Sequence, residues 1–513
     1  MMGLGLQLTC DESMKAKARY VLATFADVLG LPLVEYQTGA RLAAHDGPAV
    51  RYGPLPSAAT DLPGVLYLYA APEAKRLFAG NTPRQPDEVI YATWRGAEVP
   101  FLFPPALGRA TTGILDTLCA GVGSVVPYDL VASAFYWLSC WEETVIADRD
   151  AHGRFPYRAS LAAQLGLHDN VVDLYLELFI ALLNAIAPAG RPQLVIPSWE
   201  GDAPFVVCLT HDVDDVRLSR ARRLKFAWDQ LTRRQGTYRA AALATRAQLG
   251  WSTVWQRTDP CWTYPAFMAL EAQHGFTATY NWQAGGIGGG SRYSLAEPQV
   301  CGLIAELESG GFEVGLHGTY RAAFDEEQFN REKAALSAVL GREPVGHRQH
   351  YLRMQCEITF PIYERAGLQY DTTLGYAERE GYRNQFSYPY WPFNHGEQRP
   401  YRFLELPTAI MDATLGGYRN LSADEAWPVI EKWLRRVQAR RGCLTLLWHN
   451  LWEGYFAGYA ELYARILAWI SQAGGRGLAG REIVRQWLER TSRSTSGETT
   501  HSVAIAPGHA TRV

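Results

Sequence analysis

A histidine and three aspartates occupy positions 211–215 in the stretch LTHDVDD, just after the apolar run FVVCL. Side chains two positions apart on a strand share a face, so Asp212 and Asp214 can point together. Two carboxylates on one face raise each other's pKa unless a cation lies close to them. This favours two different roles, in which one carboxylate binds a metal ion and the other acts as a base. The alternative is a helix N-cap and a solvated turn, both of which suit aspartate.

Four further stretches carry polar side chains after apolar runs. They are EVGLHGTYR with His317, GHRQHYLR with Arg348 and His350, YDTTLGY with Asp371, and LTLLWHN with His449. Histidine and aspartate are the usual ligands of zinc sites that keep an open position, whereas an arginine can hold a carboxylate ionised. A histidine at a strand end that faces a metal can act as a general acid. A structural role in a packed core is the alternative for these histidines.

Short apolar runs alternate with helix-like stretches from residue 205 onward. The runs are FVVCLTHD, FTATYNW, FEVGLHG, PVGHRQHY, LQYDTTLG, FLELPTAI and CLTLLWHN. Near-continuous apolar strands that alternate with helices indicate a parallel sheet in an α/β architecture. About seven such units favour a distorted (β/α)7-type barrel, and barrels of this kind carry their active sites at the C-terminal ends of the strands. The polar residues named above lie at or near those ends.

The sequence predicts three parts. Residues 1–197 form a mixed α/β N-terminal domain of unknown function, which ends in the proline-rich stretch RPQLVIPSWEGDAP. Residues 198–490 form the barrel, and residues 491–513, rich in Ser, Thr and Gly, form a disordered tail. Within the barrel, 222–251 is predicted as a long helical insertion. The glycine run at 285–290 is predicted as a flexible loop near the site, since no Gly-Lys-Ser/Thr follows it.

The composition limits the classes of function. A net charge of -3 over 513 residues provides no basic footprint for nucleic acid. The eight cysteines are scattered without a CxxC pair, which disfavours a cysteine zinc site. The N-terminus lacks a secretory pattern, and no stretch approaches the roughly 18 apolar residues of a membrane span. We therefore expect a cytoplasmic protein with no nucleic-acid partner and no membrane span.

Taken in order, LTHDVDD, GLHGTY, RQHY, YDTTL and LLWHN resemble the five motifs of the polysaccharide deacetylase family, also called carbohydrate esterase family 4. The resemblance spans roughly residues 205–452. The N-terminal part, with FYWLSCWEE and DAHGRFPYRASLA, is similar to the uncharacterised region that accompanies one bacterial branch of such proteins.

The resemblance implies a role for each matching residue. Asp212 corresponds to the general base, and Arg348 to the arginine that orients it. His449 corresponds to the general acid, and Asp371 to the carboxylate that supports this acid. The backbone N–H of Tyr351 corresponds to an oxyanion donor.

The resemblance also implies a divalent metal, most plausibly Zn²⁺, held by Asp214 and His317. Asp215 is a rival to Asp214, because the family usually has its two aspartates adjacent and Val213 intervenes here. The family's second metal histidine, four residues after the first, is replaced by Arg321. His350 is the first candidate for the third ligand, and His211 is the second candidate.

The function that follows is metal-dependent hydrolysis of an N-acetyl group on an amino-sugar glycan or a small N-acetylated sugar. Tyr320, Tyr390 and Trp391 are the candidate substrate-binding residues; the last two lie in an aromatic loop, 379–393, that could present sugar-stacking faces or pack as a structural loop. A degenerate deacetylase fold with a glycan-binding or assembly role and no catalysis is the alternative function.

Overall fold

The computed structural model describes residues 3–55, 62, 64–106, 108–217, 261–286, 290–450, 456 and 458–491. Three predicted features lie wholly or partly outside these residues: the helical insertion at 222–251, half of the glycine run at 285–290, and the tail from 492. They stay predictions.

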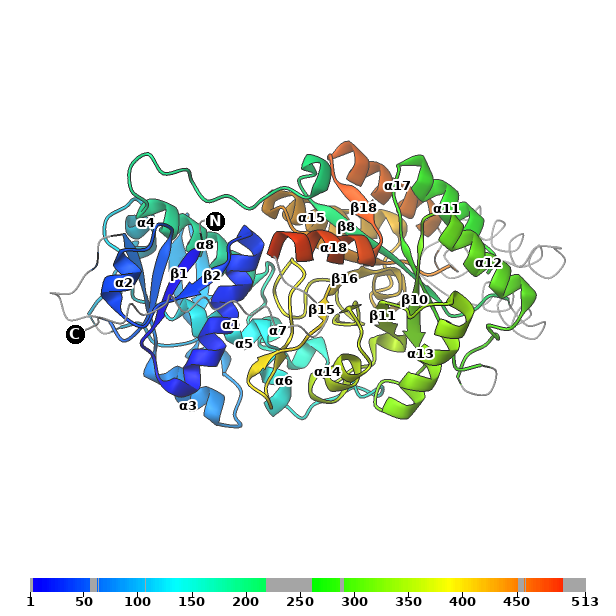
Figure 1. Ribbon diagram of the computed structural model, residues 1–513, viewed down its shortest axis with the longest axis horizontal. Helices are drawn as coiled ribbons and strands as arrows, with labels where there is room; N and C mark the ends of the chain where they lie inside the picture. The colour runs from blue at the N-terminus through cyan, green and yellow to red at the C-terminus, as the bar shows by residue number, and fades with distance from the viewer. Residues whose placement is uncertain are drawn as a thin grey trace, which may run out of the picture.

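The N-terminal part contains a five-stranded parallel sheet in the order β2-β1-β3-β4-β7 (Figure 1). Its strands are β1 (Leu4–Leu8), β2 (Leu33–Glu35), β3 (Ala49–Gly53), β4 (Val65–Tyr69) and β7 (Val125–Val126). Helix α1 (Glu12–Leu29) begins after Asp11, whose side chain accepts a hydrogen bond from the Ser13 N–H at 3.1 Å, and ends at Gly30 with φ 65°. An aspartate N-cap and a left-handed glycine are the usual start and stop signals of a helix.

The second sheet is curled, and all its strands are parallel to their neighbours. The strands are β8 (Val206–Val213), β9 (Thr279–Trp282), β10 (Glu313–Gly318), β11 (Gly346–Gln349), β12 (Tyr370–Asp371), β15 (Leu404–Glu405), β16 (Thr408–Met411), β17 (Cys443–Leu447) and β18 (Arg476–Leu478). The strand order across the sheet is β15-β12-β11-β10-β9-β8-β17-β16, and β18 also pairs with β8.

The two strands at the edges of this sheet, β15 and β16, are consecutive in the chain. Strand β15 pairs with β12, and β16 pairs with β17. Between them, the Leu406 N–H donates to the Asp371 carbonyl at 2.9 Å, and its own carbonyl accepts from Thr445 Oγ1 at 3.0 Å. The segment Leu404–Met411 therefore joins both edges of the sheet. The predicted α/β fold with a distorted parallel barrel is confirmed for the described residues, with nine strands in the sheet where about seven were expected.

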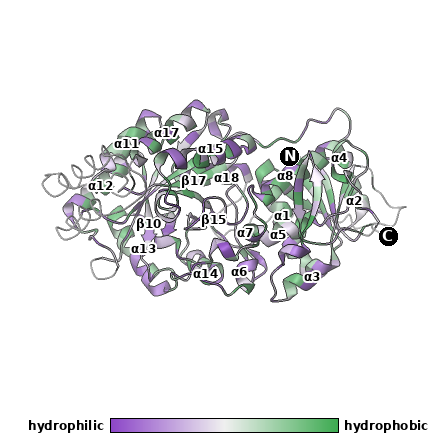
Figure 2. Cartoon of the chain, turned by 180° about the vertical axis from the view of Figure 1, so that it is seen from behind, coloured by the Kyte–Doolittle hydropathy of each residue, from purple (hydrophilic) through white to green (hydrophobic). Residues whose placement is uncertain are grey.

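Helices follow the strands and cover the outside of the curled sheet: α11 (Tyr264–Gln273), α12 (Pro298–Ser309), α13 (Glu326–Leu340), α14 (Cys356–Arg365), α15 (Ala423–Arg440), α17 (Tyr459–Gln472) and α18 (Gly480–Thr491). Figure 2 shows α13 mainly hydrophilic and α8 (Val171–Ala185) mainly hydrophobic, as expected for an outer helix and a buried one. None of the helices in the described ranges is long and apolar enough to cross a membrane.

The N-terminal part and the barrel pack against each other. A single apolar core cluster includes residues of both, from Leu4 to Trp487. Ion pairs also join them: the buried pair of Glu143 and Arg383, in which Arg383 Nε donates at 2.6 Å, and the partly exposed pair of Asp169 and Arg440, also at 2.6 Å. Helix α1 lies against α18 (Figure 1). The domain boundary expected at 197 stays a prediction.

Candidate metal centre

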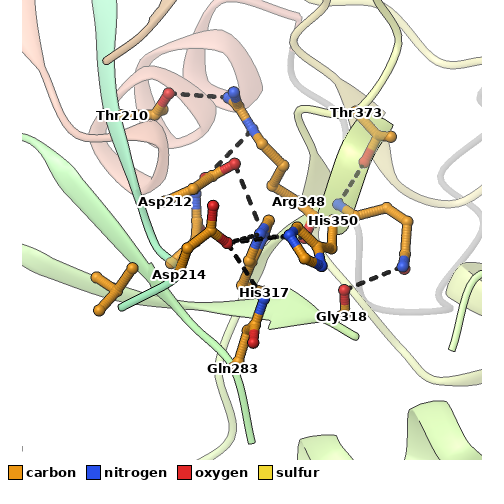
Figure 3. A network of polar contacts seen from close by, with 12 residues as sticks. Thr210, Asp212, Asp214, Gln283, His317, Gly318, Arg348, His350 and Thr373 are labelled. Atoms are coloured by element: carbon orange, nitrogen blue, oxygen red, sulfur yellow. Dashed lines mark hydrogen bonds and ion pairs between the residues drawn. The ribbon is translucent and has the colours of Figure 1, made fainter. Parts of the chain in front are cut away.

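The carboxyl ends of the parallel strands bring together the polar residues that are far apart in the sequence. Asp212 pairs in register with Asn281 on β9, and His317 on β10 pairs with Arg348 on β11. Asp214 follows β8 directly, and His350 follows β11. Because neighbouring parallel strands end at the same edge of a sheet, these side chains converge on one point (Figure 3).

Asp214, His317 and His350 form a cluster of three possible metal ligands. Asp214 Oδ1 lies 3.4 Å from His317 Nε2 and 3.1 Å from His350 Nε2 (Figure 3). Ligand atoms about 2.0–2.2 Å from a tetrahedral zinc ion lie roughly 3.3–3.6 Å apart, which is close to these separations. Gln283 Nε2 donates to the same Asp214 oxygen at 3.2 Å.

The hydrogen bonds around His317 leave one ring nitrogen for a cation. Its Nδ1 donates to the Arg348 carbonyl at 2.9 Å, which turns Nε2 toward Asp214. That Nε2 is buried and has no hydrogen-bond partner among the described residues. Burial would raise the pKa of Asp214, but His350 and His317 hold it well below its usual range. An ionised carboxylate and an unsatisfied imidazole nitrogen are the donors that zinc requires.

Asp212 lies beside this cluster with its charge balanced by cations. Burial would raise its pKa, but His317, Arg348 and His449 together lower it. Its Oδ1 accepts a hydrogen bond from Asn281 Nδ2 at 3.1 Å and lies 3.9 Å from Arg348 Nε. The predicted pairing of Arg348 with Asp212 is therefore an ion pair at the upper limit of distance, and Arg348 donates instead to Thr210 and Thr372, at 2.9 and 3.0 Å.

His449 also lies beside the cluster, with its Nε2 4.0 Å from Asp214 Oδ2. Its Nδ1 donates to Asp412 Oδ1 at 2.7 Å, and its backbone N–H donates to the other oxygen at 2.8 Å. Burial would lower the pKa of His449, but the Asp412 charge and this hydrogen bond raise it to about 10. The Asp412 carboxylate therefore favours the protonated form of His449.

The structure does not bring Asp371 to His449, so that predicted pairing is corrected. Asp371 is fully buried and accepts hydrogen bonds from His347 Nδ1 and Thr373 Oγ1, both at 2.7 Å. Asp412, and not Asp371, is the carboxylate hydrogen-bonded to His449. It follows the apolar residues TAIM of β16 directly, so the strand-end signal that identified the other residues was also present there.

Asp215 and His211, the alternative candidates for metal ligands, lie outside the cluster. Asp215 Oδ2 accepts from Arg292 NH1 at 2.6 Å. His211 lies between the Trp448 carbonyl at 2.8 Å and Glu271 Oε1 at 2.6 Å, and it is buried. Arg321, at the position of the family's second histidine, is exposed to solvent. Among the described alternatives, His350 is thus the residue that accompanies Asp214 and His317.

Two of the three predicted substrate-binding residues lie in the core. Tyr390 is 1% exposed and Trp391 is 5% exposed, because the aromatic loop packs between the barrel and the N-terminal part. The neighbouring Phe393, for example, lies 4.9 Å from Tyr20, measured between ring centroids. The prediction that Tyr390 and Trp391 offer stacking faces is wrong. Tyr320 does lie near the site, with its ring 5.7 Å from that of Tyr351.

A cavity of about 300 Å³ opens beside the candidate ligands. Its charged lining includes Asp212, Asp214, Asp215, Arg292, His350, Asp412 and His449, and its apolar lining includes Leu352, Met411 and Leu447. Tyr351 lies at its edge, 43% exposed, with φ 64°, and Leu352 follows with φ 50°. Non-glycine residues in this left-handed region cost of order 1–3 kcal/mol each and persist only where surrounding contacts hold them. Arg154, from the N-terminal part, also lines the cavity, and no local pattern in the sequence indicated it.

Comparisons with known proteins match different parts of the chain. Residues 6–188 match a family described as a family of unknown function, DUF7033. None of the curated proteins matches the chain. Similar solved structures include PuuE allantoinase, at 15% identity and a TM-score of 0.39, covering 59% of this chain and 98% of that one.

Two further similar structures are carbohydrate esterase family 4 proteins. One is a family 4 carbohydrate esterase from Streptomyces lividans in complex with acetate, at 13% identity and a TM-score of 0.27, covering 54% of this chain and 92% of that one. The other is BA3943 from Bacillus anthracis, described as a family 4 pseudoenzyme, at 10% identity and a TM-score of 0.28, covering 59% and 71% of the two chains.

Proposed function

We propose that this protein is a metal-dependent hydrolase that removes an N-acetyl group from an amino-sugar glycan or a small N-acetylated sugar. One observation carries the proposal: Asp214, His317 and His350 form a cluster of possible metal ligands, the Asp212 carboxylate lies 3.8 Å from His317, and the His449 imidazole lies 4.0 Å from Asp214. A pure binding protein has no use for an acid and a base beside a metal site.

Asp214, His317 and His350 would hold the ion, which we propose to be Zn²⁺ because one carboxylate and two imidazoles are typical zinc ligands. A bound zinc ion lowers the pKa of a coordinated water toward about 7 and polarises a carbonyl oxygen. Asp212 takes a proton from the attacking water, since its carboxylate is ionised. His449 donates its Nε2 proton to the nitrogen of the leaving group. Amide hydrolysis needs such an acid because the nitrogen leaves readily as a neutral amine but not as an anion.

The chain's other residues near the site suit an acetyl substrate. The backbone N–H of Tyr351 would donate a hydrogen bond to the oxygen that becomes negatively charged as water adds. Leu352, Met411 and Leu447 line the same cavity and form one apolar cluster that can receive a methyl group. The volume of about 300 Å³ accommodates one sugar unit better than several.

Release of acetate tests the proposal. The purified protein is assayed with and without zinc against free N-acetylated monosaccharides, nucleotide-linked N-acetyl sugars and N-acetylated oligosaccharides. We expect zinc-dependent acetate release from at least one class. Asp214→Ala should lose bound zinc and activity together, whereas Asp212→Asn should keep zinc and lose about 10²–10⁴-fold in kcat.

The outcomes separate the proposal from its alternative. A protein that binds no zinc in wild-type form, or keeps zinc equally well after Asp214→Ala, contradicts the ligand assignment. A zinc-loaded protein that binds these sugars without releasing acetate supports a glycan-binding role. The cytoplasmic location stays a prediction.

A further inference from the structure

A short turn of the N-terminal part reaches the edge of the candidate active site. The turn comprises Asp150–Arg154, in which the Arg154 backbone N–H and Nε donate to the Asp150 carboxylate at 2.9 and 2.7 Å. This double contact fixes the arginine side chain against its own turn. The guanidinium is 7% exposed and lines the cavity that contains Asp212 and His449.

The Arg154 guanidinium binds the backbone beside the candidate metal ligands. Its NH1 donates to the Tyr351 carbonyl at 2.6 Å, and its NH2 donates to the Tyr418 hydroxyl at 3.2 Å. The turn makes a second contact with the same residue, because the His152 ring stacks on the Tyr351 ring at 4.9 Å and an interplanar angle of 24°. Two side chains of the N-terminal part thus hold one residue of the barrel.

The barrel in turn holds this turn in place. Arg353 Nε donates to the His152 carbonyl at 2.9 Å, and Gln355 Nε2 donates to the Gly153 carbonyl at 3.1 Å. These two residues follow Tyr351 closely in the sequence. The contacts are therefore reciprocal, and the turn and the segment after β11 form one hydrogen-bonded unit.

The residue held in this way has an unfavourable backbone conformation. Tyr351 and Leu352 are consecutive non-glycine residues with positive φ, and they directly follow His350. Such a conformation relaxes unless its surroundings fix it. Relaxation would rotate the Tyr351 peptide and move His350, since the two share a peptide bond.

We propose that Arg154 is a positioning residue: by binding the Tyr351 carbonyl it fixes the backbone conformation of Tyr351, and so holds the preceding peptide, which carries the Tyr351 N–H, where this N–H can bind the acyl oxygen of the substrate. The inference rests on the proposed function, and it makes the N-terminal part a component of the active site. The N-terminal part then contributes a side chain to acyl-group recognition, in addition to any role of its own.

The test uses the full-length protein and two probes, zinc and acetate. Acetate carries the oxygens of the released acyl group, so its affinity for the zinc-loaded protein reports on the oxygen-binding peptide without requiring turnover. Both affinities are measured by calorimetry for wild type, Arg154→Ala and Arg154→Lys. The matched control is Arg158→Ala, since Arg158 lies in the same region, pairs with Asp148 at 3.1 Å and is 68% exposed.

We expect Arg154→Ala to weaken acetate binding by about tenfold or more, the usual effect of losing a charged hydrogen bond, with zinc affinity reduced less. Arg154→Lys should recover part of the loss, and millimolar guanidinium should partly restore acetate binding to Arg154→Ala. Arg158→Ala should match wild type. Circular dichroism confirms that each variant is folded at the temperature of the titration.

Three results would overturn the inference. They are unchanged acetate affinity in folded Arg154→Ala, an equal loss in Arg158→Ala, and a wild-type protein that binds zinc but not acetate. Failure of the proposed function looks different, because the wild-type protein would then bind no zinc at Asp214. If Arg154→Ala only lowers Tm and leaves acetate affinity intact, the residue serves domain packing alone and the inference is wrong.

Discussion

Asp412 accepts two hydrogen bonds from His449, one from the ring Nδ1 at 2.7 Å and one from the backbone N–H at 2.8 Å. The pair fixes the imidazole plane and turns Nε2 toward Asp214, 4.0 Å away. The negative charge of Asp412 also stabilises the imidazolium form. Geometry and protonation of the proposed acid therefore depend on the same carboxylate.

Removing the Asp412 charge should shift the alkaline limb of the pH profile of kcat/KM to lower pH. The pKa of His449 is raised to about 10, so the acid form exists at all lower pH values and is lost as the pH rises through that value. A bound cation repels this proton and makes about 10 an upper limit. In Asp412→Asn, the Asp412 charge no longer opposes burial and only the charges of Asp214 and Asp212 still raise the pKa of His449, so this pKa falls. Rates measured from pH 5 to 10 check this, and an alkaline limb that does not move would contradict the assignment of His449 as the acid.

Zinc should stabilise the wild-type protein and leave His350→Ala unaffected. A ligand at about 1,000 times its Kd stabilises the folded state by about 4 kcal/mol. His350 Nε2 lies 3.1 Å from Asp214 Oδ1, whereas Arg321 is exposed to solvent, so Arg321→Ala is the matched control and should respond to zinc as wild type does. Tm is measured after chelation and after zinc addition. Equal zinc stabilisation of His350→Ala and Arg321→Ala would show that His350 is not a ligand.

The sequence predicted the barrel and most of the residues that lie together at the candidate metal centre, because a polar residue after a buried run is a local signal. It could not predict which strand ends become neighbours. Asp371 and Asp412 both follow apolar runs, but β16 pairs with β17 and β12 pairs with β11, so only Asp412 reaches His449. Arg154 lies in a polar turn, and its contact with Tyr351 spans 197 positions. The prediction that Tyr390 and Trp391 bind substrate was wrong because aromatic residues are equally suited to stacking on a sugar and to packing in a buried interface, and both side chains are buried.

Glu142 should make stability depend on pH between about 4.5 and about 8. Burial raises its pKa to about 8, against hydrogen bonds from the Leu161 N–H and Tyr136 that lower it. A raised folded-state pKa gives stability that is fully present below the unfolded pKa and is lost as the pH rises through about 8. The free energy of unfolding of Glu142→Gln relative to wild type should therefore improve by a few kcal/mol from pH 5 to pH 8. Urea titrations of both proteins at four pH values measure this.

Breaking the ion pair between Glu143 and Arg383 should destabilise the N-terminal part and the barrel together. Arg383 Nε donates to Glu143 Oε1 at 2.6 Å, and the two side chains are 1% and 5% exposed. Glu143→Gln leaves the Arg383 charge buried without a counter-ion, which typically costs about 3–5 kcal/mol. Glu73→Gln breaks an exposed pair with Arg76 and should cost at most about 1 kcal/mol. Urea unfolding is followed by circular dichroism and by tryptophan fluorescence. A small loss in Glu143→Gln, or a loss seen by one probe only, would mean that the two parts unfold separately and that the turn carrying Arg154 is not held by their shared interface.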